Sequence, residues 1–250
     1  MRYMQLKPTM RHAIKSNGSA VVVKMLHPFS NELEILRHLH QIDSPYNHTI
    51  PLLLTLELNM VGTFVFLPEA TPLDHGFALG MFRSEVVDFS RQLIEGVAFL
   101  HSCGVAHLDI KPQNIVAHPN RLFIIDFDIS VRVDGPKALI DRRCGTPGWM
   151  APEIGRQDRP RCSYSPIRAD LWSCGLVLRY LASNGTVKEN PFKILTRQLL
   201  NKDPRLRPLL HQQSPFRVRH SLSRPQVRMK RKPDPLPHGA KRLAIGTVHP

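Results

Sequence analysis

The stretch HLDIKPQN, residues 107–114, places a histidine, a carboxylate, a lysine and a carboxamide within eight residues. Groups of these types could hold a phosphate donor and an attacking hydroxyl in line, because a carboxylate can accept the hydroxyl proton and a cation can stabilise phosphate charge. Twelve residues after Asn114, Asp126 stands at the end of the apolar run LFII. Taken alone, HLDIKPQN is more often a polar structural loop.

Three further motifs follow in order along the chain. CGTPGWMAPE occupies residues 144–153, DLWSCG occupies 170–175 and KDPRLRP occupies 202–208. Together the five motifs resemble, in order and spacing, the signature set of eukaryotic-type protein kinases. The resemblance runs from about Val21 to Pro208. It implies an α+β bilobal protein-kinase-like fold with a reduced β-rich N-lobe and a larger α-helical C-lobe, and it implies ATP and Mg²⁺ as cofactors.

The resemblance also implies a role for each matched residue. Asp109 matches the catalytic base, and Lys111 matches the cation that faces the transferring phosphate. Asn114 and Asp126 match the two magnesium ligands, and their hard oxygen donors suit Mg²⁺. Lys24, in the strand-like run VVVKML, matches the lysine that binds the α- and β-phosphates. Alone, Lys24 would be read as a solvated strand lysine.

Two further parts of a nucleotide site follow from position in the family pattern. Glu32, in ELEIL, fits as the ion-pair partner of Lys24, although helical geometry leaves Glu34 as an alternative. Segment 64–69, FVFLPE, is expected to be the hinge between the lobes. The hinge residues expected to bind the cofactor are Phe66, Leu67 and Pro68.

Several other matched residues are expected to be structural or to select the substrate. Thr146 and the position of Lys111 before a proline resemble serine/threonine kinases, so the expected partner is a protein with a serine or threonine acceptor. Glu153 and Arg207 are expected to form a buried ion pair. Asp170, at the head of a buried helix, is expected to anchor the catalytic-loop backbone.

The chain departs from the family pattern at several positions. Leu108 stands where many kinases have an arginine that binds a phosphorylated loop, and Asp128 replaces the glycine of DFG. The only glycine before Lys24 is Gly18, so there is no glycine-rich phosphate loop, and Glu32 comes only eight positions after Lys24. Short chains of this kind resemble some fungal kinase-like proteins. The departures leave a pseudokinase, a binding module or scaffold with little turnover, as the alternative to an active kinase.

Periodicity predicts the elements that must position these residues. Asn17-Gly18 predicts a β-hairpin over 13–26, and two further strands are expected at 51–58 and 61–67. Helices are expected at 31–40, with Asn31 as the cap, and at 84–104, 170–185 and 194–204. The predicted domains are a truncated N-lobe and hinge (1–69), a C-lobe (70–213) and a tail (214–250).

Charge is concentrated in the predicted tail. The net charge of the chain is +14. Residues 214–250 contain nine lysines and arginines but only one acid, so most of this charge lies there. This composition predicts a disordered basic tail that could touch nucleic acid only weakly, and the cluster RMKRKP (228–233) is a weak nuclear signal. The sequence has no transmembrane run, no secretory signal and no CxxC pair, so we expect an intracellular protein, cytoplasmic or nuclear. The oligomeric state is not predicted.

Overall fold

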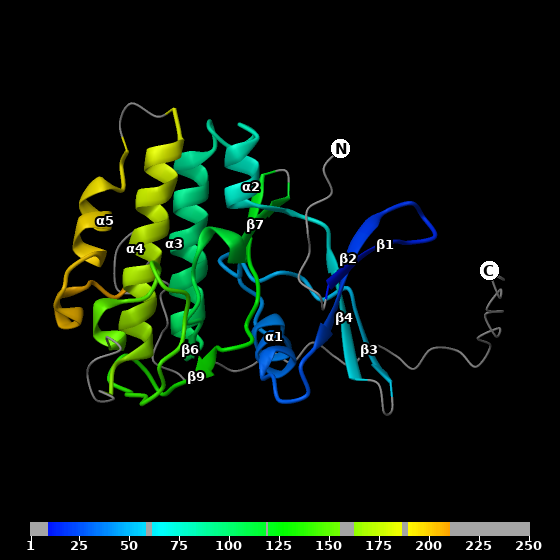
Figure 1. Ribbon diagram of the computed structural model, residues 1–250, viewed down its shortest axis with the longest axis horizontal. Coiled ribbons are helices and arrows are strands. Elements are labelled where there is room, and N and C mark those ends of the chain that lie inside the picture. Colours follow the sequence, from blue (N-terminus) through cyan, green and yellow to red (C-terminus); the bar gives the residue numbers. More distant parts are fainter. Residues whose placement is uncertain (1–9, 59–61, 119, 156–162, 187–189, 211–250) are drawn as a thin grey trace.

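The computed structural model describes residues 10–58, 62–118, 120–155, 163–186 and 190–210. The predicted basic tail and its cluster at 228–233 lie outside the described residues. In the described part, no helix is both long enough and apolar enough to cross a membrane. A sheet-rich part and a helical part face each other (Figure 1), so the predicted bilobal α+β fold is confirmed.

The sheet-rich lobe is one antiparallel sheet with a single helix. Its elements are β1 (Met10–Ile14), β2 (Ala20–Leu26), α1 (Glu32–His40), β3 (Leu54–Leu58) and β4 (Gly62–Pro68). The strand order is β1-β2-β4-β3, with Lys24 opposite Val65 and Val22 opposite Leu67. Because side chains alternate across a strand, these four residues share one face of the sheet. In Figure 1 this sheet lies on the right and α1 lies between it and the helical lobe.

The predicted hairpin is present. Strands β1 and β2 pair antiparallel, and Gly18 adopts a φ of +82° in the turn between them. The Asn17 side chain accepts a hydrogen bond from the Ser19 N–H at 3.1 Å, and Lys15 N–H donates to the Ser19 carbonyl at 2.9 Å. Glycine and asparagine are the residues that such a turn needs, which explains why the sequence signal was reliable.

Helix α1 follows β2 after only five residues. Its buried face is formed by Glu32, Ile35, Leu36 and Leu39, a spacing of three and four residues that keeps them on one side. Asn31 occupies the predicted N-cap position, but its side chain makes no capping hydrogen bond. The Ser30 hydroxyl instead accepts from the Glu32 N–H at 3.2 Å.

The helical lobe is built on two long helices that lie side by side (Figure 1). Its helices are α2 (Leu73–Ala78), α3 (Val86–Ser102), α4 (Pro166–Asn184) and α5 (Lys193–Leu199). Helix α3 buries apolar side chains along most of its length, and α4 is buried over most of its circumference. Phe89 and Leu93 of α3 and Leu171 and Val177 of α4 belong to one continuous core that extends to α1 and β4.

Two helix boundaries differ from the prediction. Helix α4 begins at Pro166, where the Ser165 hydroxyl caps the Arg168 N–H, so Asp170 lies inside the helix and not at its head. Helix α5 ends at Leu199, and Pro204 begins a separate 3-10 turn, η3 (Pro204–Leu206). Proline is favoured in the first turn of a helix, which accounts for the start of α4 at Pro166 and of η3 at Pro204.

Short strands hold the polar loops between the two lobes. They are β5 (Thr71–Pro72), β6 (Val105–Ala106), β7 (Ile115–His118), β8 (Arg121–Ile124) and β9 (Val131–Arg132), with the 3-10 turns η1 (Pro112–Asn114) and η2 (Pro152–Ile154). Strand β5 pairs with β7 and β7 with β8, while β6 pairs with β9. The stretch 107–114 therefore runs between β6 and β7, and Asp126 follows β8 closely.

Glu153 and Arg207 form the expected ion pair, with nitrogen–oxygen distances of 2.5 and 2.8 Å. The Arg207 side chain is fully buried, donates to the carbonyl of Asn201 at 2.9 Å and lies over the Trp172 ring at 5.2 Å. The bidentate pair and the stacked ring satisfy a charge that would otherwise be costly to bury.

We expect Arg207→Ala to lower the free energy of unfolding by about 3–5 kcal/mol, because it leaves the Glu153 carboxylate without its partner. Urea denaturation measures the change. The matched control is Arg205→Ala, since Arg205 also pairs with an aspartate, Asp203 at 2.7 Å, but its side chain is 86% exposed. The control should not change stability measurably, and equal losses in both variants would contradict the structural role of the buried pair.

Candidate active site

The catalytic-loop backbone is anchored by a carboxylate from α4. Asp170 accepts hydrogen bonds from the N–H groups of His107 at 2.6 Å and Leu108 at 2.7 Å. It also contacts His101 Nε2 at 3.1 Å. Leu108 has a φ of +68°, a conformation that costs a non-glycine residue free energy and needs support from its surroundings. The sequence-based expectation that Asp170 anchors this loop fits these contacts.

A second set of contacts joins the catalytic loop to the segment that carries Asp126. His107 Nε2 lies 2.9 Å from the Ile125 carbonyl, and its ring lies 4.8 Å from the ring of Phe127. Asp126 itself has a φ of +70°. Both aromatic rings are buried, so the two polar loops are held in register by an apolar contact as well as by a hydrogen bond.

Asp109 lies at the centre of a compact polar cluster. Its carboxylate contacts Lys111 Nζ at 2.6 Å, the Thr146 hydroxyl at 2.6 Å and the Asn114 amide nitrogen at 2.8 Å. Lys111 Nζ also lies 2.6 Å from the same Thr146 hydroxyl. The Asn114 nitrogen additionally donates to the Asp109 carbonyl, which leaves the amide oxygen as the atom able to face a cation. The structure therefore brings together Asp109, Lys111 and Asn114, the three residues of the stretch 107–114 to which the resemblance gives a chemical role.

Lys24 forms a second cluster on the sheet side of the cleft. Its ammonium is buried and lies 2.5 Å from Glu32 Oε2 and 2.7 Å from Asp126 Oδ1. Glu34, the alternative partner, is 71% exposed and lies 3.5 Å from Arg132 instead. The geometry thus selects Glu32, because it is the glutamate on the buried face of α1.

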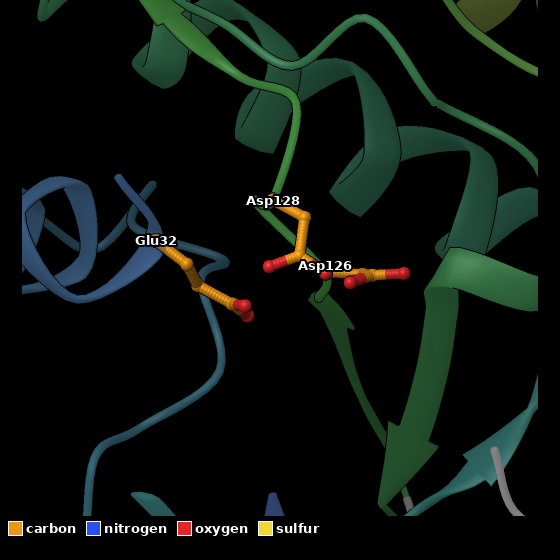
Figure 2. A group of neighbouring side chains, drawn as sticks. All are labelled: Glu32, Asp126 and Asp128. Carbon is orange, nitrogen blue, oxygen red and sulfur yellow. The ribbon is translucent and has the colours of Figure 1, made fainter. Parts of the chain in front are cut away.

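Asp128 adds a third carboxylate beside Lys24. One carboxylate oxygen from each of Glu32, Asp126 and Asp128 lies within 4.8 Å of the others, and Figure 2 shows these groups converging from α1 and from the chain after β8. Burial raises the pKa of Glu32; the Lys24 ammonium lowers it, and Asp128 raises it, so the net shift is upward. Burial lowers the pKa of Lys24, but Glu32 and Asp126 raise it by more, so the lysine stays charged.

The carboxylate of Asp128 is also tied to the start of helix α1. Its Oδ1 accepts a hydrogen bond from the Ser30 hydroxyl at 2.8 Å, and its Oδ2 lies 3.5 Å from Lys24 Nζ. Since the same Ser30 hydroxyl caps the Glu32 N–H, one side chain connects helix α1 with the loop after β8. Where the family pattern has a glycine, this chain has a side chain that bridges the two lobes.

An apolar cavity of about 530 Å³ adjoins both clusters. Asn114 and Asp126 line it, as do the hinge residues Leu67 and Pro68. The lining residues that the sequence reasoning did not name include apolar side chains, such as Val22 and Val116, and the polar side chains of Asp74, His75 and Gln113. A cavity of this size with few polar groups is typical of a small-molecule site.

Two of the three hinge residues expected to bind the cofactor line the cavity, Leu67 and Pro68. Phe66 is not among the lining residues; its carbonyl accepts a hydrogen bond from the Leu53 N–H at 2.8 Å. Pro68 has no N–H and can offer only its carbonyl to a bound base.

Comparison with known proteins identifies the family of this chain. The family model for the protein kinase domain matches residues 23–193, more than half of the chain. The chain belongs to the protein kinase family. This kinase-family chain is 44% identical over 96 residues to CBL-interacting protein kinase 29 of Oryza sativa subsp. japonica, a match that covers 38% of the chain and 20% of that relative.

Two further relatives are similar over segments of the same size. Serine/threonine-protein kinase grp of Drosophila melanogaster is 38% identical over 104 residues, covering 40% of the chain and 19% of the relative. CBL-interacting serine/threonine-protein kinase 2 of Arabidopsis thaliana is 40% identical over 105 residues, covering 40% and 22%. The matched segments thus span about a fifth of the length of these relatives.

We expect Ser30→Ala to lower the free energy of unfolding by about 1 kcal/mol, because the start of α1 loses its capping hydroxyl. Thermal and urea denaturation measure the loss. Asn31→Ala is the matched control, since the exposed Asn31 side chain makes no capping bond and its removal should leave stability unchanged. A larger loss from Asn31→Ala than from Ser30→Ala would show that the helix is capped differently.

Proposed function

We propose that the chain is an ATP- and Mg²⁺-dependent protein kinase that transfers a phosphoryl group to a serine or threonine hydroxyl. The observation that carries the proposal is the contact between the Asp109 carboxylate and an aliphatic hydroxyl, that of Thr146, at 2.6 Å. The Lys111 ammonium contacts the same Thr146 hydroxyl oxygen. A carboxylate that holds one hydroxyl in this way has the geometry needed to orient an acceptor hydroxyl.

The proposed roles follow from where each group lies. Asp109 orients the acceptor hydroxyl and takes up its proton, and Lys111, beside it, stabilises the negative charge of the transferring group. Asp170 acts at a distance by holding the loop backbone. Because phosphoryl transfer needs little covalent chemistry from the protein, correct placement of these groups supplies most of the catalysis.

The residues around the cavity fit the two cofactors. The apolar lining suits a planar base, and the buried Lys24 ammonium suits phosphate oxygens. The Asp126 carboxylate and the Asn114 amide oxygen would hold Mg²⁺, which when bound neutralises charge on the phosphates. The three carboxylates around a single lysine leave excess negative charge at this place, and a divalent cation would offset it.

One observation favours a second candidate, the pseudokinase. Within residues 10–26 only Met10 and Val22 line the cavity, and the hairpin turn at Asn17-Gly18 does not reach it. The described chain therefore supplies no glycine-rich turn over the phosphates, and nucleotide affinity should be lower than in kinases that have one. A scaffold that binds partners through the same fold would tolerate this loss.

The first test is phosphotransfer from labelled ATP and Mg²⁺ to a generic basic protein. We expect Asp109→Asn to lower the rate about 100-fold or more, because a general base contributes at least that factor. The control is Asp134→Asn, which alters an exposed aspartate and should leave the rate unchanged. Equal background from the wild type and Asp109→Asn would favour the pseudokinase.

A second test separates nucleotide binding from transfer. Glu32→Gln should lower kcat/KM for ATP about tenfold, because a charged hydrogen bond that positions Lys24 is lost. Glu34→Gln, two residues away on the exposed face of the same helix, should have no effect. Kinetics at varied ATP concentration measure both variants. An effect of Glu34→Gln as large as that of Glu32→Gln would show that the ion pair does not serve nucleotide use.

A further inference from the structure

Asp128 brings a third carboxylate to the buried ammonium of Lys24. Lys24 Nζ lies 2.5 Å from Glu32 Oε2 and 2.7 Å from Asp126 Oδ1, but 3.5 Å from Asp128 Oδ2. The side chains of Glu32 and Asp126 are 2% and 6% exposed, whereas that of Asp128 is 42% exposed. The lysine therefore has two close partners, and Asp128 stands farther away at the open side of the cluster.

The Ser30 hydroxyl holds the Asp128 carboxylate in this place. It donates to Asp128 Oδ1 at 2.8 Å and accepts from the Glu32 N–H at 3.2 Å, so it serves both as donor and as acceptor. The Ser30 backbone is itself fixed, because its N–H donates to the His27 carbonyl at 2.9 Å. The hydroxyl is thus presented from a defined turn and restrains Asp128 at its distance from Lys24.

The backbone at Asp128 does not require the glycine of the family pattern. Among the described residues, the non-glycine residues with positive φ are Leu108 and Asp126, so Asp128 lies outside the region that favours glycine. The chain turns here, with the Ser130 N–H donating to the Phe127 carbonyl at 3.1 Å. An aspartate therefore fits without backbone strain, and its effect on the site comes from its charge.

The charge of Asp128 bears directly on the proposed phosphate contact of Lys24. An ammonium has three donors, and two of them serve Glu32 and Asp126. The third faces Asp128 at 3.5 Å, a distance at which a hydrogen bond is weak, so it is the donor that a phosphate oxygen would take. Without Ser30, the Asp128 carboxylate would be drawn toward this donor, because attraction between opposite charges grows as the distance falls.

We propose that Ser30 is a positioning residue whose hydroxyl restrains the Asp128 carboxylate, so that one donor of Lys24 stays available to a nucleotide phosphate. The inference rests on the proposed function, because it assigns Lys24 to phosphate. Ser30 and Asp128 then form one functional pair, although 98 positions separate them in the sequence. The serine is needed because the aspartate is present, and a chain with glycine at position 128 would not need it.

The first test asks whether removal of Asp128 rescues the loss of Ser30. Ser30→Ala should raise the KM for ATP about tenfold, because a hydrogen bond to a charged group is lost and Asp128 then competes for Lys24. When Asp128→Gly is also present, Ser30→Ala should change the KM by no more than about twofold, because the two residues act as a pair. Steady-state kinetics compare the wild type, both single variants and the double variant. An equal rise in KM with and without Asp128 would overturn the proposal.

Stability separates this role from the capping bond that Ser30 provides to α1. Ser30→Ala should lower the urea midpoint whether or not Asp128 is present, since the Glu32 N–H loses its acceptor in both cases. The KM should rise only where Asp128 is present. Ser30→Thr keeps the hydroxyl and should keep the KM, and Asn31→Ala should change neither quantity. A KM that follows the urea midpoint in all variants would reduce Ser30 to a helix cap and overturn the proposal.

Nucleotide binding makes the test independent of turnover. Titration calorimetry with Mg²⁺ and a non-hydrolysable ATP analogue gives dissociation constants for the same four chains, and we expect the same weakening and rescue. If no chain transfers phosphate but this pattern is found, the proposed kinase function has failed and the role of Ser30 stands. Unchanged affinity in Ser30→Ala would overturn the role of Ser30 and leave the kinase function in place. A wild type that binds no nucleotide would overturn both.

Discussion

The geometry of the site depends on one buried carboxylate, that of Asp170. Its oxygens accept hydrogen bonds from two consecutive backbone N–H groups, those of His107 and Leu108. Without Asp170 these N–H groups would be buried without partners. These bonds also support the left-handed backbone at Leu108, a conformation that costs about 1–3 kcal/mol. Asp109 follows immediately, so the direction in which the catalytic carboxylate points is set by an aspartate in the middle of helix α4.

The other half of the site is held by electrostatics across the cleft. Lys24 from the sheet meets Glu32 from the helix and Asp126 from the helical lobe, and Asp128 reaches Ser30. Burial makes such charges costly unless they are paired, and here the pairing also fixes how the lobes face each other. Apolar contacts complete the arrangement, since Phe127 packs on His107 and Leu108 packs in a buried cluster with Ala151 and Ile154.

Much of this arrangement could be predicted from short-range signals. Asn17-Gly18 identified the hairpin, the spacing of leucines identified α1, and the ordered motifs located Asp109, Asn114 and Asp126. The choice between Glu32 and Glu34 could not be made, because both belong to the first turn of the helix and only the packing of α1 decides which is buried. The Ser30–Asp128 bond joins residues 98 positions apart, so no local pattern could indicate it.

One misplaced helix start had a signal in the sequence that was not used. Ser165-Pro166 is a helix-start signal, and it would have placed Asp170 inside α4. Here the local capping chemistry outweighed an expectation taken from position in the family pattern.

The five residues between β2 and α1 limit how far the helix can travel. Such a link can extend by no more than roughly 3.5 Å per residue, and its last residues are held by the Ser30 hydroxyl. A ligand that displaces α1 away from the sheet would have to extend this link and break the Ser30 hydrogen bonds. The apolar cavity next to Val22 and Val116 needs no such movement, so a ligand could occupy it with the link and its Ser30 contacts intact.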